Sequence, residues 1–319
     1  MNRFIPDPFI PILLATVVLA TLFPASGHAA DRLSMLATAA VMLLFFLHGI
    51  KLPRENLVAA LVNWRLHVVI LGTTYMGFPL LGLALSKLWP SLLPADLWAG
   101  VLFLCALPST VQMSIAFTSM ARGNVAASVT SAALSNVLGI VLTPLIAGAL
   151  LHAQGGGSVP LSGIWKVVLQ LLLPFIIGHL LRPLLAEWGA RRRLLISWSD
   201  RLTILLSVYS AFSAAVIDGI WSRIPLATLL VTALVCATLL ALVMLLLLRG
   251  TRLAGFPQAE QRSALYCGAF KSVVSGVPMA RVLFPSAQIG AMILPLMMYH
   301  QLQMMVSATL APRQARRDP

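Results

Sequence analysis

Lys271 is the side chain with the clearest chemical requirement, because it lies near the middle of an otherwise apolar run, Ala264–Phe284. An ammonium at membrane depth costs roughly 2.5 to 3.5 kcal/mol on insertion scales, so it needs a partner or a function there. The nine Asp and Glu residues fall in loops, termini or span ends, so none is available to pair with it. Backbone carbonyls, the Ser272 hydroxyl or an anionic substrate could be partners, and the ammonium could also release its proton. The alternative is that the Lys271 side chain snorkels to the cytoplasmic interface. That interface is about seven residues away along the helix, and at ~1.5 Å per residue the distance exceeds comfortable side-chain reach.

The residues around Lys271 favour an interrupted helix. Gly268, Gly276 and Pro278 disfavour a continuous helix. Ser272 and Ser275 offer hydroxyls to the backbone groups that an interruption frees. A similar interruption, Pro108–Ser114, occurs in the first half of the chain. Broken backbone inside a membrane must be buried in protein or line a wet cavity, so we expect the two breaks to face each other. Paired interruptions of this kind point to the binding site of a secondary transporter.

Further polar candidates cluster at the first break and in the span that follows it. Gln112 carries an amide that is costly to leave unpaired, and Asn136 is the better candidate ligand of its span. The hydroxyls of this region could instead serve small-residue helix packing or bond to neighbouring helix carbonyls. The candidates of this region are Ser109, Thr110, Gln112, Ser114, Ser128 and Asn136.

His300 lies in a polar run, Tyr299–Gln303, midway along the last apolar segment. A histidine there could relay protons or contact substrate, and interhelical hydrogen bonding is the alternative. The three cysteines, Cys105, Cys236 and Cys267, all fall within apolar segments, so we expect packing residues and no disulfide framework. Nucleophile elbows, phosphate loops, metal-ligand spacings and paired acids are absent from the sequence, so we expect neither an enzyme nor a cofactor.

The elements that position these residues are membrane spans. Of 319 residues, 59% are hydrophobic and only 10% charged, against about 25% charged in soluble domains. This composition and a mean hydropathy of +0.93 indicate an all-α polytopic membrane protein. Ten spans of about 20 residues fit the length. They are Phe9–Phe23, Leu33–Ile50, Leu66–Leu85, Leu97–Met120, Val125–Leu151, Gly163–Leu184, Leu202–Ile220, Pro225–Leu248, Ala264–Phe284 and Ala287–Leu310.

The net charge of +13 reflects membrane orientation rather than nucleic-acid binding. Loop parity assigns sixteen of the 22 Lys and Arg to the side with both termini, five to the other side, and Lys271 to the membrane. This asymmetry is a positive-inside signal and predicts a cell-membrane protein with both termini in the cytoplasm. Arg3, a short apolar run and Ser26–Ala30 also resemble a signal peptide, whose cleavage would leave nine spans.

The spans divide into two groups of five within a single membrane domain, residues 1–319. The halves are 9–151 and 163–310, joined by the linker-like stretch His152–Pro160, and the fourth span of each is interrupted. Because five is odd, the second half enters the membrane from the opposite side. The hydropathy pattern therefore predicts two inverted five-helix repeats. Between the fourth and fifth spans, Asn124 is expected to cap the following helix.

At these residues the chain resembles the bile acid:sodium symporter family, and best its bacterial symporter-like subgroup. The resemblance is carried by Pro108–Asn124, its continuation to Pro144, and Lys271–Pro278. It implies ten helices, with the broken fourth and ninth crossing in a core domain. The first, second, sixth and seventh helices would form a panel against that core.

The family's sodium ligands carry over only in part. Ser114 and Ser128 match ligand positions, which implies a residual sodium site, whereas a family asparagine is Ile115 here and a family threonine is Ala132. Thr74 corresponds to a glutamine of the third span. The glutamate and glutamine that the family shares between two sodium sites have no counterpart in the ninth span.

A lysine in place of that carboxylate would repel a cation, by about 4 kcal/mol for unit charges 4 Å apart at a dielectric of 20. We therefore expect Lys271 to stand where relatives bind sodium. Transport would be sodium-independent, or coupled to protons through Lys271 itself. The expected substrate is a small amphipathic organic anion, and the partners are that substrate and the lipid bilayer. A non-transporting membrane regulator or scaffold, and an exporter related only in fold, are the alternatives.

Overall fold

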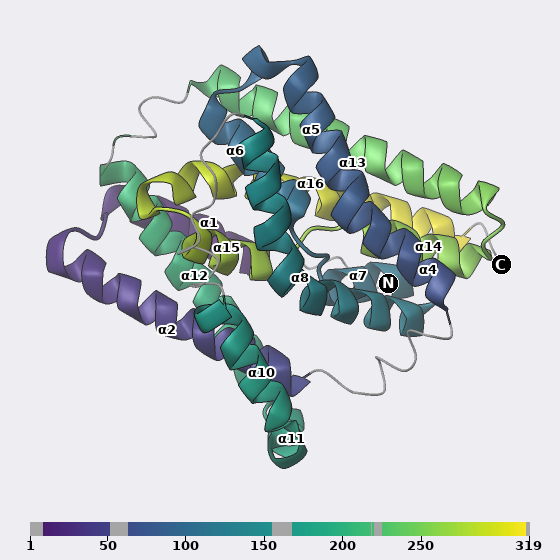
Figure 1. The fold of residues 1–319 in the computed structure, drawn as a ribbon, viewed down its shortest axis with the longest axis horizontal. Coiled ribbons are helices and arrows are strands. Elements are labelled where there is room, and N and C mark those ends of the chain that lie inside the picture. The colour runs from purple at the N-terminus through teal and green to yellow at the C-terminus, as the bar shows by residue number, and fades with distance from the viewer. Residues whose placement is uncertain (1–8, 52–62, 155–167, 218, 220–224, 317–319) are drawn as a thin grey trace. The chain divides into compact units, whose positions relative to one another are not determined.

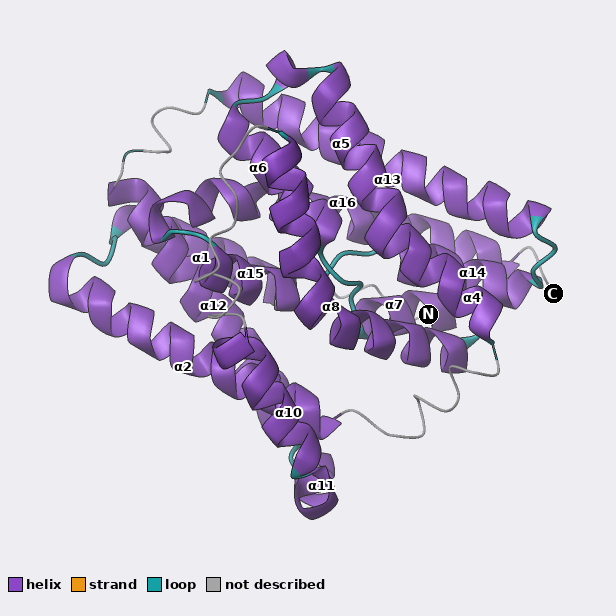
Figure 2. Ribbon diagram, viewed as in Figure 1, coloured by secondary structure: helices purple, strands orange, loops and turns teal. Residues whose placement is uncertain are grey.

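The computed structural model describes residues 9–51, 63–154, 168–217, 219 and 225–316. Every regular element in this part of the chain is helical, which confirms the predicted all-α class (Figures 1 and 2). Within it, five helices are long and apolar enough to cross a membrane, whereas Ala95–Ala106 and Leu169–Leu180 are shorter apolar helices. The five are Gly27–Ile50, Trp64–Leu88, Val125–Ala153, Leu226–Leu253 and Gln288–Arg316. The count of ten spans and the inverted repeat stay predictions.

The chain forms two compact units, each assembled from separate stretches. The first unit comprises Met1–Lys51, Ser162–Pro225 and Val277–Ala291. Its complete helices are α1 (Phe9–Leu22), α2 (Gly27–Lys51), the π-helical turn η3 (Val168–Leu172), α10 (Leu173–Leu180), α11 (Arg182–Arg191) and α12 (Arg193–Ile217). It also contains most of α15 (Val273–Leu283) and the start of α16 (Ser286–Arg316).

Glycines allow α2 and α10 to pack closely in this unit. A Cβ atom at Gly49 would collide with the Phe175 carbonyl oxygen, and one at Gly178 with the Phe46 carbonyl oxygen. Small residues are the usual means by which membrane helices approach at backbone distance.

The second unit comprises Leu52–Leu161, Leu226–Gly276 and Met292–Pro319, and it contains both helix breaks. Its first helices are α4 (Trp64–Gly72), the π-helical turn η1 (Thr73–Gly77), α5 (Phe78–Leu88), the 3-10 turn η2 (Pro90–Leu92), α6 (Ala95–Ala106), α7 (Gln112–Met120) and α8 (Val125–Ala153). They are followed by α13 (Leu226–Leu253), α14 (Gln258–Ala269), the first turn of α15 (Val273–Leu283) and most of α16 (Ser286–Arg316).

The structure confirms both predicted interruptions. The first separates α6 from α7, because Pro108 has no N–H and disfavours a helical conformation at Leu107, which is extended with φ −73° and ψ 154°. The second separates α14 from α15 at Phe270–Ser272. Gly268, Gly276 and Pro278 were expected to interrupt the helix, but Gly268 lies inside α14 and the other two lie inside α15. Pro278 is the sixth residue of α15, so it lacks the N–H that would bond the carbonyl four residues earlier. Membrane helices tolerate such a proline where neighbouring groups satisfy the carbonyl.

Span boundaries differ from the prediction where polar residues continue a helix or end one. The seventh span was predicted to begin at Leu202, but α12 already begins at Arg193, since a polar segment escapes a hydropathy criterion and still forms helix. The sixth was predicted to run to Leu184, yet α10 ends at Leu180 and α11 starts at Arg182. The start of that span and most of the predicted linker lie outside the described residues.

The turn between α7 and α8 confirms the predicted cap. The Asn124 side-chain oxygen accepts a hydrogen bond of 3.0 Å from the Ala127 N–H. Arg122 adopts a positive φ of 58° in this turn. The Asn124 N–H donates to the Ala259 carbonyl at 3.0 Å, so the turn is tied to the first turn of α14.

Candidate functional site

Lys271 is fully buried, with 0% of its surface exposed, in the segment between α14 and α15. Its Nζ donates hydrogen bonds to the carbonyl oxygens of Thr74 (3.0 Å), Cys105 (3.0 Å) and Leu107 (2.7 Å). The ring centroid of Phe78 lies 4.0 Å from Nζ, within the range of a cation–π interaction. An ammonium has three donors, so all of them are used. The snorkelling alternative is wrong, because the side chain ends inside the protein.

The three acceptor carbonyls are available for reasons of local structure. Cys105 and Leu107 lie at the C-terminal end of α6, where the last carbonyls lack helical partners and carry the negative end of the helix dipole. Thr74 lies in the π-helical turn η1, where the regular i→i−4 pattern is displaced. The ammonium therefore occupies the negative end of a half-helix.

Gln303 of α16 holds the backbone of Lys271. Its side-chain oxygen accepts from the Lys271 N–H at 2.9 Å, and its Nε2 lies 3.2 Å from the Lys271 carbonyl oxygen, to which it donates. The His300 Nδ1 lies 2.9 Å from the same Nε2. The predicted site residue His300 is thus connected to Lys271 through Gln303. The sequence prediction included Gln303 in a polar run but did not single it out.

Serines of the first break satisfy the end of α14. The Ser109 hydroxyl donates to the Cys267 carbonyl at 2.6 Å, and the Ser114 hydroxyl donates to the Tyr266 carbonyl at 3.1 Å. The hydroxyls of Ser109 and Ser114 lie 3.2 Å apart, and the Thr110 hydroxyl lies 3.3 Å from that of Ser114. Three predicted site residues are therefore in one buried cluster.

Asn136 connects this cluster to the start of α15. Its Nδ2 donates to the Ser109 carbonyl at 2.9 Å, and its Oδ1 accepts from the Ser275 hydroxyl at 2.8 Å. The Ser272 hydroxyl accepts from the Ser275 N–H at 3.1 Å and so acts as the N-cap of α15. The Ser272 N–H donates to the Pro108 carbonyl at 3.0 Å, a direct backbone bond between the two breaks.

Three predicted residues have different roles from those expected. Gln112 is exposed at the first position of α7, so the cost of burying its amide does not arise. The Thr74 hydroxyl bonds to the Ile70 carbonyl at 2.8 Å, and only the Thr74 backbone carbonyl contacts Lys271. The Ser128 hydroxyl is buried and donates to the Thr118 hydroxyl at 2.9 Å.

Two further hydroxyls at the breaks were not singled out from the sequence. The Thr143 hydroxyl donates to the Ala106 carbonyl at 2.8 Å, and the Tyr299 hydroxyl donates to the Ala269 carbonyl at 2.7 Å. Each completes the end of a half-helix. A hydroxyl in an apolar segment near a predicted break is a weak signal, and it does not specify which carbonyl is the acceptor.

Ser114 and Ser128, which the resemblance implies as residual sodium ligands, are both buried. They contribute neutral hydroxyls, each already bonded to another oxygen of the protein. The described residues contain no group of three or more His, Cys, Asp or Glu placed to hold a metal ion. Neither hydroxyl carries a negative charge that would offset the charge of a sodium ion.

Comparisons with known proteins agree with the predicted resemblance. Residues 7–316 match the model of the SBF-like CPA transporter family. The chain is 47% identical to protein PA2026 of Pseudomonas aeruginosa, over 99% of this chain and 95% of that protein. It is 45% identical to the Escherichia coli (strain K12) protein named "Putative symporter YfeH", over 97% and 93% of the two chains. It is 27% identical to sodium/bile acid cotransporter 7-B of Xenopus laevis, over 98% and 92%. The chain belongs to the SBF-like CPA transporter family.

Proposed function

We propose that this protein is a secondary transporter that moves a small amphipathic organic anion across the bacterial inner membrane by alternating access. The family and the names of the Escherichia coli and Xenopus relatives support a transporter of the multi-pass membrane type. The proposal adds that Lys271 replaces the sodium ion expected at the crossing and makes transport sodium-independent.

One observation carries this proposal, the set of contacts around the Lys271 ammonium. A cation held by three carbonyls and an aromatic face is already coordinated as a bound ion would be. A second cation 4 Å away would be repelled by about 4 kcal/mol at a dielectric of 20. The geometry therefore favours a covalent cation over a dissociable one.

The two helix breaks, as far as the structure describes their surroundings, contain no carboxylate, which supports an anionic substrate. Asn136, Ser272 and Ser275 contribute amide and hydroxyl groups beside the N-terminus of α15, which carries the positive end of a helix dipole. In transporters, such half-helix termini face anionic groups of the substrate. The substrate would reach these groups when the crossing opens during the transport cycle.

A non-transporting regulator or scaffold is the second candidate. It is favoured by the hydrogen bonds that the polar groups at the two breaks make to one another, which leave Lys271 fully buried. Coupling to protons through Lys271 is a variant of the transport proposal. It requires the ammonium to leave its three carbonyls and release its proton in part of the cycle.

The test is uptake of a panel of amphipathic organic anions into proteoliposomes, with wild-type protein, Lys271→Met and Lys87→Met. Lys87 is exposed and serves as the matched control. We expect saturable uptake that changes less than twofold when sodium replaces choline, falls at least tenfold in Lys271→Met and is retained in Lys87→Met. A tenfold rise with sodium, or wild-type uptake by Lys271→Met, would overturn the proposal. Uptake under an imposed pH gradient tests proton coupling. If transport is coupled to protons, the gradient should accelerate uptake several-fold.

A ligand-stability screen of the same panel distinguishes transport from a scaffold role. Thermal stabilisation by a substrate, lost in Lys271→Met and weakened in Gln112→Ala, supports transport. No response to any anion, together with no uptake, supports the scaffold.

A further inference from the structure

A cavity of about 140 Å³ lies away from the crossing, between the start of α4 and the turn from α13 to α14. It is much larger than the 10–15 Å³ that one water requires on the same measure. The first residue of α4, Trp64, is 61% exposed, and the last residue of α13, Leu253, is 87% exposed. Exposed aromatic residues at the end of a membrane helix mark the depth of the lipid headgroups. The cavity is therefore placed where a headgroup could enter.

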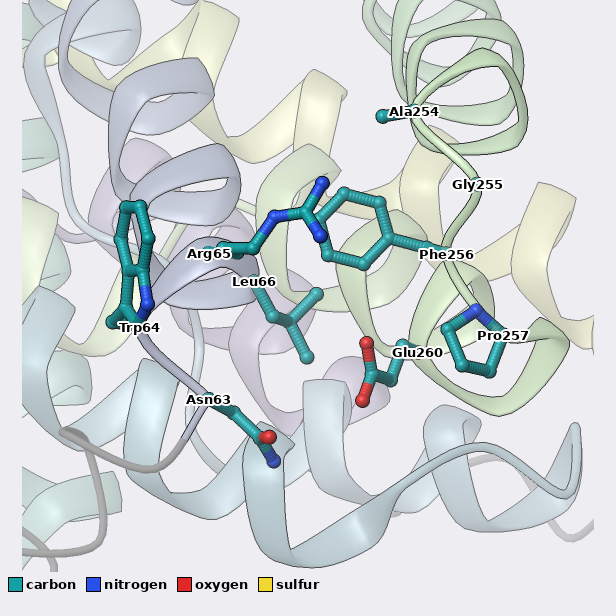
Figure 3. Close-up of a pocket in the computed structure, with 9 residues that line it drawn as sticks. All are labelled: Asn63, Trp64, Arg65, Leu66, Ala254, Gly255, Phe256, Pro257 and Glu260. Atoms are coloured by element: carbon teal, nitrogen blue, oxygen red, sulfur yellow. The ribbon is translucent and has the colours of Figure 1, made fainter.

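Arg65 provides the positive side of this cavity. Its guanidinium lies over the ring of Phe256, with 5.4 Å from Cζ to the ring centroid (Figure 3). Stacking on an aromatic face holds the guanidinium plane and leaves the N–H groups at its edge for an anion. Arginine is the side chain best suited to bind phosphate oxygens through two parallel hydrogen bonds.

Glu260 provides the negative side. It lies in the first turn of α14, is partly buried, and points its carboxylate towards Leu66 (Figure 3). A carboxylate in a first helical turn also interacts favourably with the helix dipole, which accounts for its location without any ligand. The dipole interaction does not explain why the Glu260 carboxylate lines the same cavity as Arg65. Asn63 adds an amide to the same lining.

We propose that this cavity binds the headgroup of a zwitterionic aminophospholipid. The phosphate would bind Arg65, the primary ammonium would donate to Glu260 and Asn63, and an acyl chain would lie beside Trp64. A quaternary choline has no N–H to donate to the carboxylate. A glycerol headgroup has no ammonium, so the negative charge of Glu260 would stay without a cationic partner.

The test is lipid binding by the purified full-length protein, followed by native mass spectrometry and thermal unfolding. The probes are dioleoyl phosphatidylethanolamine, phosphatidylcholine and phosphatidylglycerol. The variants are Arg65→Gln, Glu260→Gln and Glu260→Asp. The controls are Arg252→Gln and Glu187→Gln, which change exposed charges outside the cavity.

We expect wild-type protein to bind phosphatidylethanolamine about three- to tenfold more tightly than the other two lipids. Glu260→Gln should remove this preference, Glu260→Asp should keep most of it, and Arg65→Gln should weaken all three lipids. Both controls should behave as wild type, and retained thermal unfolding will show that the variants fold.

Equal binding of the three lipids, or a preference that survives Glu260→Gln, would overturn the proposal. Tighter binding of phosphatidylglycerol would assign the cavity to anionic lipids instead. Glycerophosphoethanolamine has the headgroup without acyl chains. Binding of this compound as tight as that of the lipid would assign the cavity to a soluble ligand and also contradict the proposal.

Discussion

The C-terminal ends of α6 and α14 both have carbonyls that lack helical hydrogen-bond donors, and the two ends differ in which groups supply those donors. At α6, Lys271 bonds the carbonyls of Cys105 and Leu107, and the Thr143 hydroxyl bonds that of Ala106. At α14, the carbonyls of Tyr266, Cys267 and Ala269 accept from hydroxyls alone, those of Ser114, Ser109 and Tyr299.

The difference shows that each break supplies donors to the other helix, but only one of them supplies a formal charge. Charge-assisted hydrogen bonds are roughly twice as strong as neutral ones. The junction at α6 should therefore resist opening more than the junction at α14. Variants at both junctions test this asymmetry.

Lys271→Met should have the largest effect. It leaves three carbonyls without their charged donor, and we expect a loss of about 3 kcal/mol of unfolding free energy, reduced from the full hydrogen-bond cost because a buried charge is also removed. Reversible unfolding in mixed micelles measures it, with Lys87→Met as a control that changes by less than about 0.5 kcal/mol. Unchanged stability in Lys271→Met would mean that the charged end is no stronger than the neutral one.

Chemical rescue sharpens the same comparison. In Lys271→Ala, propylammonium should restore part of the stability and uptake, because it can donate to the same carbonyls. Tetramethylammonium, which has no N–H, should not. Equal rescue by both cations would show that charge alone, without hydrogen bonds, accounts for the effect.

Gln303→Leu should have the second largest effect. It removes the two hydrogen bonds that hold the Lys271 backbone, and we expect a loss of about 2 kcal/mol. Gln288→Leu, an exposed glutamine on the same helix, is the control. A loss below about 0.5 kcal/mol would indicate that Lys271 is positioned by its ammonium alone.

Tyr299→Phe and Thr143→Val compare neutral donors at the two helix ends. Each change removes one hydroxyl and leaves one carbonyl unsatisfied, so each should cost about 1 kcal/mol. Values within about 0.5 kcal/mol of each other would show that the two ends differ only through Lys271. A larger cost at α14 would reverse the expected order of strength.

Gln112→Ala should have the smallest effect on stability, within about 0.5 kcal/mol, because the side chain is exposed. If the proposed substrate contacts this amide, its half-saturating concentration should rise a few-fold at unchanged maximal uptake. A loss of stability above about 1 kcal/mol would instead give Gln112 a structural role.

The breaks could be predicted because prolines and buried charges have few tolerated environments. Pro108 and Lys271 each indicated an interrupted span, and Asn124 indicated a helix start. The acceptors of the Lys271 ammonium could not be predicted, because every residue has a backbone carbonyl and the sequence does not indicate which carbonyls accept. Thr74 illustrates this, because its side chain suggested a site and its carbonyl is the group that contacts Lys271.

The role of Gln303 was also beyond sequence reasoning. Its amide lies 32 positions along the chain from the backbone that it holds, and only the packing of α16 beside the second break brings the two together. Similarly, Gln112 is polar within an apolar run, and nothing in its spacing indicated that it would be exposed at a helix start.

A cation that is part of the polypeptide has a consequence for the energetics of the proposed transport. It returns with the carrier in every cycle, so it dissipates no ion gradient and cannot drive accumulation. A monovalent anion then distributes according to the membrane voltage, at about 2.3 kcal/mol per 100 mV. That corresponds to roughly fiftyfold in favour of the outside of a cell with a negative interior. A tethered ammonium would thus make efflux of the anion the spontaneous direction.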